Sequence, residues 1–187
     1  FSIYPRPQMK RDSYLCLNGY WDFKIKRKEN EIFSGEILVP FAVESRISGV
    51  EREIKKNEKM VYSKSFGLPD GFLKDRLILH FGAVDQYATV YINNTEIGKN
   101  AGGYLPFSFD ITDYIVRSGV NTVSVVVSDP LDKNLPYGKQ TDKRGGMWYT
   151  KVSGIWQSVW LESVCEAFIE KIKITPEHHK EHEDKTI

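Results

Sequence analysis

Short runs of alternating apolar and polar residues dominate the chain. One of them places Val123, Val125 and Val127 on one face of an extended segment, because successive side chains of a strand point to opposite faces. Runs of this kind occupy residues 20–26, 76–81, 86–93 and 121–129. They are rich in β-branched and aromatic residues, which suit a half-buried sheet surface. The pattern predicts about ten short strands.

Turn residues fall between these runs. The pair at 93–94, Asn-Asn, tolerates the positive φ angles of a type I′ hairpin turn, and the Pro-Asp-Gly at 69–71 is typical of a tight turn. Only residues 110–119 offer a short helical turn, capped by Asp110 or Thr112. The sequence therefore predicts an all-β fold, an antiparallel sandwich or jelly roll.

Two tryptophans, Trp156 and Trp160, lie four positions apart in the run 154–161. A helix and a strand would both bring them to one face. Alternation continues through this run, and Gly154 at its start disfavours a helix. We therefore expect one strand with both tryptophans on the same face, with one face of the strand on the core and the other toward a neighbouring domain.

Composition and charge argue against some classes of function. The chain has 187 residues, enough for one domain that buries roughly 70% of its unfolded surface. Its 26 basic and 25 acidic residues give a net charge of +1, which lacks the basic footprint of a nucleic-acid binder. No apolar run reaches the roughly 18–20 residues of a membrane span, and no signal peptide is recognisable at the start. The compartment is left open.

The two cysteines, Cys16 and Cys165, are too few for a disulfide framework, and their spacing fits no metal motif. Both lie in strand-like runs, so we expect small buried hydrophobic side chains. They would touch only if the first and last strands were neighbours.

No catalytic, metal or cofactor site is predicted. The acids are scattered over turns and strand edges; Glu162 stands alone in a strand, and we expect Glu44 to anchor its loop by hydrogen bonds. Ser153 lacks the pattern of a nucleophile elbow. The tail motif HHKEH, from His178 to His182, has a spacing seen in zinc sites, but it follows a proline in a charged tail and is interpreted as a solvated linker.

The stretch 129–152 has no periodicity. Loops of this length are usually functional or disordered, or else they pack on their own strands. This one mixes Tyr137, Trp148 and Tyr149 with charged and amide side chains, a combination that suits a sugar or a protein partner.

Four blocks of the sequence are distinctive enough to be compared with a known family. They read LNGYWDF at 17–23, VPFAVESRISGV at 39–50, VDQYATVYINNTEIGKNAGGYLPFSFDIT at 84–112, and YGKQTDKRGGMWYTKVSGIWQSVWLESV at 137–164. Together they resemble the N-terminal sugar-binding domain of glycoside hydrolase family 2, which includes β-galactosidases, β-glucuronidases and β-mannosidases. The blocks stand in the family's order and cover most of the chain.

The resemblance implies a jelly-roll β-sandwich of the galactose-binding-domain type over 1–167. Residues 168–187 would then be the strand and linker that lead into a truncated immunoglobulin-like domain. In the family a barrel follows and holds the two catalytic glutamates of a retaining mechanism. We therefore expect a non-catalytic part of a longer enzyme that meets its carbohydrate substrate through that enzyme. We also expect self-association of this fragment through apolar surface left uncovered.

The resemblance also implies that the loop at 129–149 reaches the mouth of the barrel and contacts the terminal sugar. The candidate substrate-binding residues are Lys139, Gln140, Asp142, Trp148 and Tyr149. Aromatic faces suit sugar C–H groups, and convergent polar groups suit hydroxyls. One departure is that Gly145 and Gly146 stand where some family members carry an acid before the Met-Trp pair.

Two other classes of function remain open from the residues alone. The chain would serve as an autonomous carbohydrate-binding module if it presented a solvent-facing aromatic platform and bound free sugar. It would serve as an adhesion sandwich if no sugar were involved. Neither the sugar nor the linkage follows from these blocks.

Overall fold

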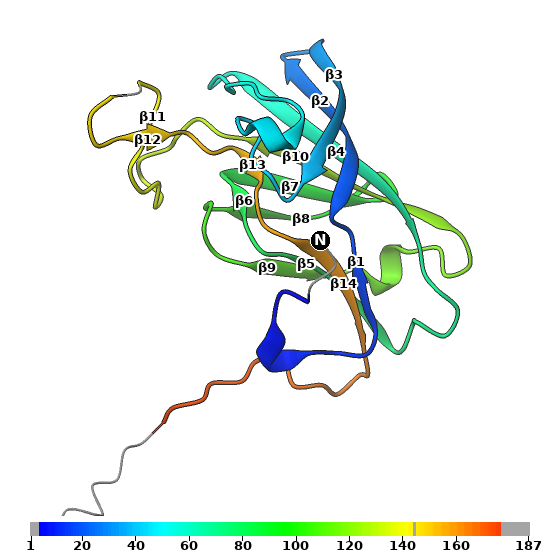
Figure 1. Ribbon diagram of the computed structural model, residues 1–187. Helices are drawn as coiled ribbons and strands as arrows, with labels where there is room; N and C mark the ends of the chain where they lie inside the picture. The colour runs from blue at the N-terminus through cyan, green and yellow to red at the C-terminus, as the bar shows by residue number, and fades with distance from the viewer. Residues whose placement is uncertain (1–3, 144, 177–187) are drawn as a thin grey trace, which may run out of the picture.

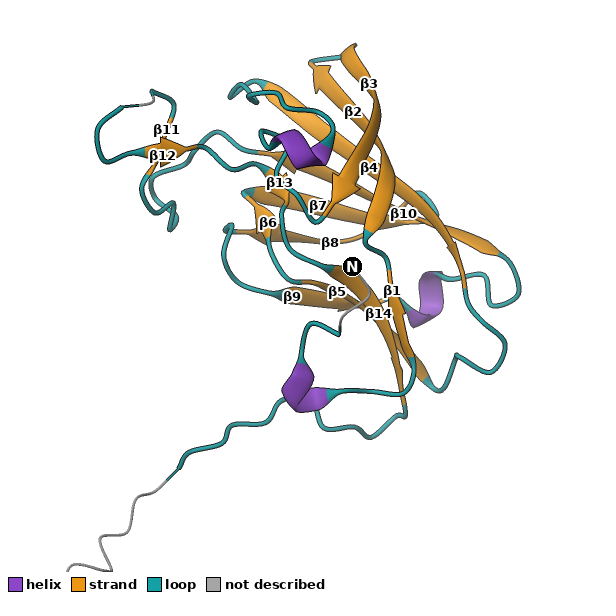
Figure 2. Cartoon of the chain, viewed as in Figure 1, coloured by secondary structure: helices purple, strands orange, loops and turns teal. Residues whose placement is uncertain are grey.

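The computed structural model describes residues 4–143 and 145–176. Two antiparallel sheets lie face to face (Figures 1 and 2), which confirms the predicted all-β jelly-roll sandwich. The large sheet has the strand order β3-β2-β4-β10-β7-β8, with β3 Asn30–Val39, β2 Gly19–Arg27, β4 Glu58–Gly67, β10 Val120–Ser128, β7 Tyr87–Ile92 and β8 Thr95–Ala101. The small sheet has the order β1-β14-β5-β9, with β1 Tyr14–Cys16, β14 Val159–Val164, β5 Arg76–Phe81 and β9 Phe107–Asp110.

Two further pairs of short strands complete the architecture. Strands β6 (Val84–Asp85) and β13 (Gly154–Ile155) pair antiparallel beside the sandwich, whereas β11 (Gln140–Thr141) and β12 (Tyr149–Thr150) pair in parallel. Helical structure in the described residues is limited to three 3₁₀ turns, at Pro7–Met9, Arg46–Ser48 and Thr112–Tyr114. The last turn has Ile111 at its N-cap and no side-chain cap, so the predicted capping by Asp110 or Thr112 is wrong; Asp110 Oδ1 instead accepts a hydrogen bond from the Thr112 amide at 3.0 Å just before the turn.

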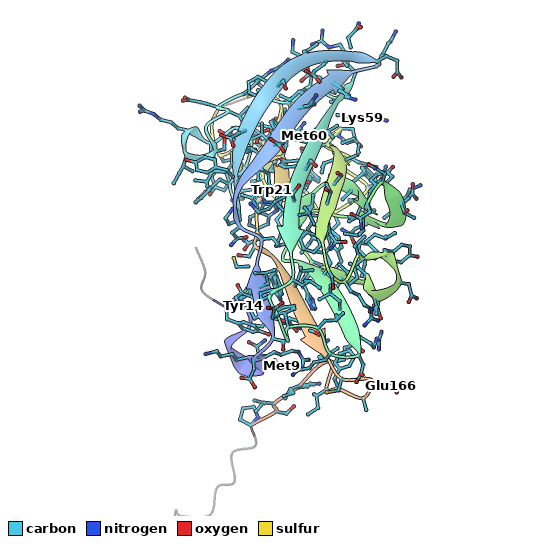
Figure 3. All side chains as sticks on the ribbon, turned by 90° about the vertical axis from the view of Figure 1, so that its right-hand side faces the viewer. Met9, Tyr14, Trp21, Lys59, Met60 and Glu166 are labelled. Atoms are coloured by element: carbon cyan, nitrogen blue, oxygen red, sulfur yellow. The ribbon has the colours of Figure 1, made fainter. Side chains whose placement is uncertain are left out.

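The core fills the space between the two sheets with the inward side chains of the alternating runs. The large sheet contributes Trp21, Phe23, Ile25, Met60, Tyr62, Val123, Val125 and Val127, and the small sheet contributes Leu77, Leu79, Phe81 and Leu161. Figure 3 shows Trp21 and Met60 on the large sheet and Tyr14 on the small one. Alternation in the runs 20–26, 76–81 and 121–129 had already grouped their core residues on one face, whereas Met60 and Tyr62 of β4 lie outside the runs identified in the sequence.

The predicted turns are also present. Asn93 and Asn94 have φ angles of 49° and 67° and join β7 to β8. The Phe72 amide donates to the Pro69 carbonyl at 3.0 Å and closes the turn at 69–71.

The prediction of one strand carrying both tryptophans is wrong. The chain leaves β13, which pairs with β6, and enters β14 of the small sheet only at Val159. Gly154, the first residue of β13, has φ +87°, and a Cβ atom there would overlap the Tyr62 hydroxyl, so the position needs glycine; the change of sheet follows at residues 156–158. Trp156 consequently donates to the Gly103 carbonyl at 2.9 Å, and Trp160 to Glu162 at 2.8 Å. Alternation alone does not reveal a change of sheet within a run.

The strand predicted at the start of 168–187 is absent from its described part, 168–176. Ile169, Ile172 and Ile174 are exposed there, and no strand lies beside them to accept their backbone groups. The histidines of HHKEH lie outside the described residues.

The prediction of two buried cysteines is wrong, because Cys16 is half-buried and Cys165 is exposed. The first and last strands are neighbours, with Cys16 opposite Trp160 on β14. Cys165 lies just beyond the end of β14 and is exposed rather than buried, and the two thiols are not joined.

Candidate functional site

The long unpatterned stretch forms a projection that we call the arm, residues 139–150. Its two limbs pair through β11 and β12, with Gln140 opposite Tyr149 and Thr141 opposite Thr150. The Tyr149 amide donates to the Lys139 carbonyl at 2.8 Å. Figure 2 shows the arm standing away from both sheets at one end of the sandwich.

Four of the five predicted site residues lie on the exposed part of the arm. Trp148 is 46% and Tyr149 65% exposed, unusual values for large aromatic side chains. Lys139 is exposed as well, and Asp142 forms a solvent-facing ion pair with Lys56 at 3.3 Å. Contact of these side chains with a sugar stays a prediction.

Gln140, the fifth predicted residue, lies at the base of the arm and is only 7% exposed. Its Nε2 donates to Asp85 Oδ2 at 3.2 Å and to the Tyr104 hydroxyl at 3.1 Å. Its Oε1 accepts from the Val152 amide at 2.6 Å. The side chain therefore joins the arm to the body of the domain and is turned away from solvent.

A buried ion pair between Lys151 and Asp129 also holds the base of the arm. Lys151 and Asp129 are 2% and 1% exposed. Lys151 Nζ donates to the carbonyls of Asp129 at 2.7 Å and Ile54 at 3.2 Å, and lies 3.4 Å from Asp129 Oδ2. Ser153 Oγ donates to the same carboxylate at 2.7 Å. Sequence reasoning missed this pair, although the alternation of Lys151, Ser153 and Ile155 marks one inward face.

Glu44 has the anchoring role expected from the sequence. Its Oε2 accepts a hydrogen bond from the Ser153 amide at 2.9 Å. Burial raises the pKa of the Glu44 carboxyl, and the hydrogen bonds from Ser153 only partly offset this effect.

Asp85, on β6, is the most perturbed acid of the base. Burial, followed by the nearby negative charge of Asp129, raises the pKa of its carboxyl from 3.8 to about 6, against the opposing effect of the Gln140 hydrogen bond. The carboxyl packs so closely on Gly103 that a Cβ atom there would overlap it. Because Asp85 is 4% exposed, its proton is not presented to a substrate.

The raised pKa gives a pH prediction. A carboxyl whose pKa is higher in the folded state binds protons more tightly when folded, so its contribution to stability is lost as pH rises from 3.8 through about 6. This corresponds to at most about 3 kcal/mol, at about 1.4 kcal/mol per tenfold change. We expect Asp85→Asn, which keeps an acceptor for Gln140, to raise the free energy of unfolding by about 2 kcal/mol at pH 8 and to leave it unchanged near pH 4. Urea unfolding at both pH values measures the difference, and equal shifts at both would contradict it.

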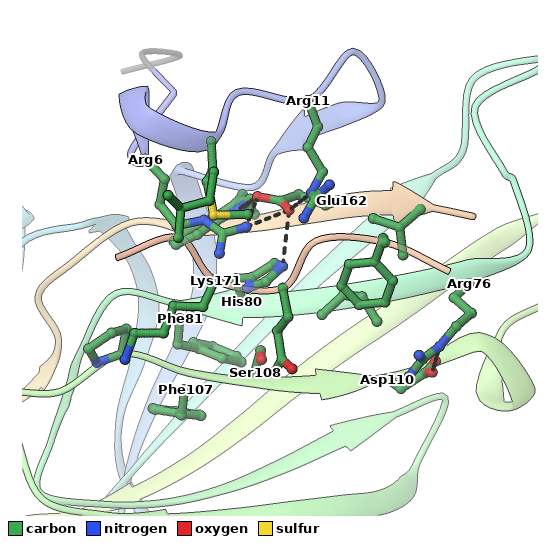
Figure 4. A pocket seen from close by; sticks show the side chains of 18 of the residues that line it. Arg6, Arg11, Arg76, His80, Phe81, Phe107, Ser108, Asp110, Glu162 and Lys171 are labelled. Atoms are coloured by element: carbon green, nitrogen blue, oxygen red, sulfur yellow. Dashed lines mark hydrogen bonds and ion pairs between the residues drawn. The ribbon is translucent and has the colours of Figure 1, made fainter. Parts of the chain in front are cut away.

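A separate cavity of about 630 Å³ lies on the outer face of the small sheet, and none of its lining residues belongs to the arm. Figure 4 shows Arg6 and Arg11 reaching Glu162 across this face, with Arg76 beside Asp110. Arg6 Nη2 lies 2.5 Å from both Glu162 oxygens, Arg11 Nε lies 2.8 Å from Oε2, and Arg76 Nε lies 2.7 Å from Asp110. These arginines are therefore neutralised by the protein itself.

Glu162 is the centre of this second cluster and is 1% exposed. Burial alone would raise the pKa of its carboxyl, but the His80 imidazole 3.5 Å away and hydrogen bonds from Tyr4, Trp160 and Arg6 outweigh burial and hold the pKa well below its usual range. His80 stacks on Trp160 with ring centroids 4.9 Å apart, and burial lowers the pKa of its imidazole. Three of the residues that bind Glu162 come from 4–11, so the cluster docks the N-terminal segment on the sheet.

The described residues contain neither a metal-binding cluster nor a membrane-spanning helix. No group of three or more His, Cys, Asp or Glu side chains there is arranged to hold a metal ion. In the same part of the chain no helix has the length and apolar character needed to cross a membrane.

Comparison with known proteins gives a consistent result. Residues 37–164 match the family model described as the sugar binding domain of glycosyl hydrolases family 2. A β-galactosidase of Thermoanaerobacter pseudethanolicus is 32% identical over 59% of this chain and 14% of its own length. A β-glucuronidase of Paenibacillus borealis is 27% identical over 73% of this chain and 24% of its own. The chain thus spans less than a quarter of the length of these curated relatives.

Solved structures show the same similarity. The β-glucuronidase of Ruminococcus gnavus, in complex with D-glucaro-d-lactam, superposes with a TM-score of 0.64 at 25% identity. The superposition covers 85% of this chain and 30% of that one. The described sandwich therefore corresponds to one portion of a larger known enzyme.

Proposed function

The chain belongs to the sugar-binding domain family of the family 2 glycosyl hydrolases, and from this premise we propose that it is the non-catalytic sandwich of a retaining exo-glycosidase. In this proposal it supports a catalytic barrel and lends its arm to the substrate pocket. The immunoglobulin-like domain and the barrel, elsewhere in the enzyme, are its partners. The substrate class is a β-glycoside, since the relatives include both a β-galactosidase and a β-glucuronidase.

One observation carries the proposal: exposed aromatic side chains on an arm whose base is buried and hydrogen-bonded to the body of the domain. Binding residues are commonly found on loops that a rigid scaffold positions. The rings of Trp148 and Tyr149 offer faces for sugar C–H groups, and the neighbouring Lys139 offers a donor for hydroxyls. Both rings are about half or more exposed, so they contribute little to this domain's own stability and are accessible to a ligand.

The experiment is a kinetic comparison in the enzyme that contains this domain. We expect Tyr149→Ala to lower kcat/KM for a nitrophenyl glycoside by about tenfold, which corresponds to about 1.4 kcal/mol of lost binding. Tyr20→Ala is the matched control, because Tyr20 is 63% exposed but lies on β2 in the large sheet. Equal effects of the two substitutions would rule the arm out of the substrate pocket.

The autonomous carbohydrate-binding module is the second candidate, since the exposed Trp148 and Tyr149 would also suit free sugar. Calorimetric titration of the isolated chain with galactose and glucuronic acid separates the two. A dissociation constant tighter than about 1 mM, or about −4 kcal/mol, would favour the module. Weaker binding, with no hydrolysis of a chromogenic glycoside, would favour the supporting role.

A further inference from the structure

We propose that Gln140 is a positioning residue whose amide, held by Asp85 and Tyr104, sets the direction of the arm and so places Tyr149. Only the last step, from the position of Tyr149 to sugar turnover, rests on the proposed function. The first step concerns the order of the arm itself and is testable without a substrate.

The geometry supports this role because one amide joins four separate segments. Gln140 belongs to β11, Asp85 to β6, Tyr104 to the loop after β8, and Val152 to the segment just after the arm. The three bonds, at 3.2, 3.1 and 2.6 Å, use both the amide nitrogen and the amide oxygen. Few alternative arrangements would satisfy the same groups, so the amide fixes one orientation.

The arm has little else to define its direction. Its two strands contain two residues each and pair only with one another among the described strands. Parallel pairs this short are weak by themselves. The Lys151–Asp129 ion pair holds the chain just after the arm. Gln140 alone connects the start of the arm, at β11, to β6.

The charge around Asp85 makes the position selective for an amide. Asp85 faces Asp129 and Glu44 as well as Lys151, so carboxylates outnumber the single ammonium group. A second carboxylate at position 140 would lack the N–H that Asp85 accepts and would repel it. The Asp85 carboxyl occupies the space that a side chain at position 103 would fill, so glycine is needed there for the acid to face Gln140.

The test swaps the amide at position 140 and the carboxyl at position 85 in the 187-residue chain. We expect Gln140→Glu to accelerate hydrogen–deuterium exchange of the arm amides at least tenfold at pH 7.5. Adding Asp85→Asn should restore the protection, because the new amide at 85 donates to the new carboxylate at 140. The Val152 amide would keep its acceptor there, and the Tyr104 hydroxyl, which accepts from Gln140 in the wild type, would donate to the new carboxylate.

Two further variants provide an alternative to Gln140→Glu and a control. Gln140→Leu removes the bonds without adding a charge and should also loosen the arm, so the question stays open to measurement if Gln140→Glu does not fold. Asn121→Asp is the control, because Asn121 is a fully buried, hydrogen-bonded amide in β10. It should leave exchange of the arm unchanged.

The outcomes separate the two proposals. Unchanged protection in Gln140→Glu and Gln140→Leu, failure of the double substitution to restore it, or equal loosening by Asn121→Asp would each overturn the positioning role. If the arm loosens and is restored as expected, the same variants are assayed in the enzyme that contains the domain. Loosening with unchanged kcat/KM would leave the positioning role intact and contradict the function proposed for the arm.

Discussion

Lys151→Met is expected to lower the free energy of unfolding by about 4 kcal/mol at pH 7, because it leaves the charge of Asp129 buried without its cation. The Asp129 and Ile54 carbonyls would also lose a donor. Methionine retains most of the lysine stem, so packing changes little and the effect reports mainly on charge. Urea unfolding followed by tryptophan fluorescence measures it.

A double-mutant cycle tests the cause. Adding Asp129→Asn removes the stranded charge while keeping an acceptor for the Leu131 amide, so the double variant should recover roughly 1–3 kcal/mol. Lys56→Met is the matched control, because Lys56 pairs with Asp142 at 65% and 44% exposure and should contribute less than about 1 kcal/mol. Full additivity of the two core substitutions would show that the pair does not act as a unit.

Glu162→Gln is expected to lower the free energy of unfolding by about 3 kcal/mol at pH 7. The substitution leaves two arginines facing each other without a carboxylate, and the partial exposure of Arg6 and Arg11, 25% and 19%, places the loss at the low end for buried pairs. The N-terminal segment should loosen, so trypsin should cleave faster after Lys10 and Arg11. Urea unfolding and timed proteolysis measure the two effects.

The pH dependence of Glu162 has the opposite sign to that of Asp85. A carboxyl whose pKa is lowered on folding stabilises the protein above its ordinary pKa, near 4.5, and the stabilisation is lost as pH falls below it. Below pH 4 the wild-type chain and Glu162→Gln should therefore converge in stability. Glu31→Gln, at the exposed pair with Lys24, should stay close to wild type in stability at every pH. A constant gap between wild type and Glu162→Gln down to acidic pH would contradict the assignment.

Most strands of the sandwich were predictable because the residues that determine each strand and turn are neighbours in the sequence. Alternation in runs such as 121–129 identifies both the strand and its buried face, and Asn93 and Asn94 identify a turn by their own backbone preferences. Features that depend on a partner were not predictable. Residues 168–176 alternate like a strand, yet a strand forms only where another strand accepts its backbone groups.

The site was predictable in outline only. The aromatic and polar composition of 129–152 indicated a functional loop, and Trp148 and Tyr149 are indeed exposed on it. Gln140 was grouped with them because composition does not distinguish the tip of a loop from its base. Asp85 and Tyr104, which enclose it, are 55 and 36 positions away in the sequence, so only the folded chain reveals the contact.

The buried base of the arm also makes this domain a natural acceptor for foreign peptide. Between the two fixed limbs lie 142–148, including Asp142, Met147 and Trp148, whose side chains are exposed. Randomised or longer sequences inserted there would leave the sandwich core untouched, so libraries built on this segment would explore new recognition chemistry on an unchanged scaffold.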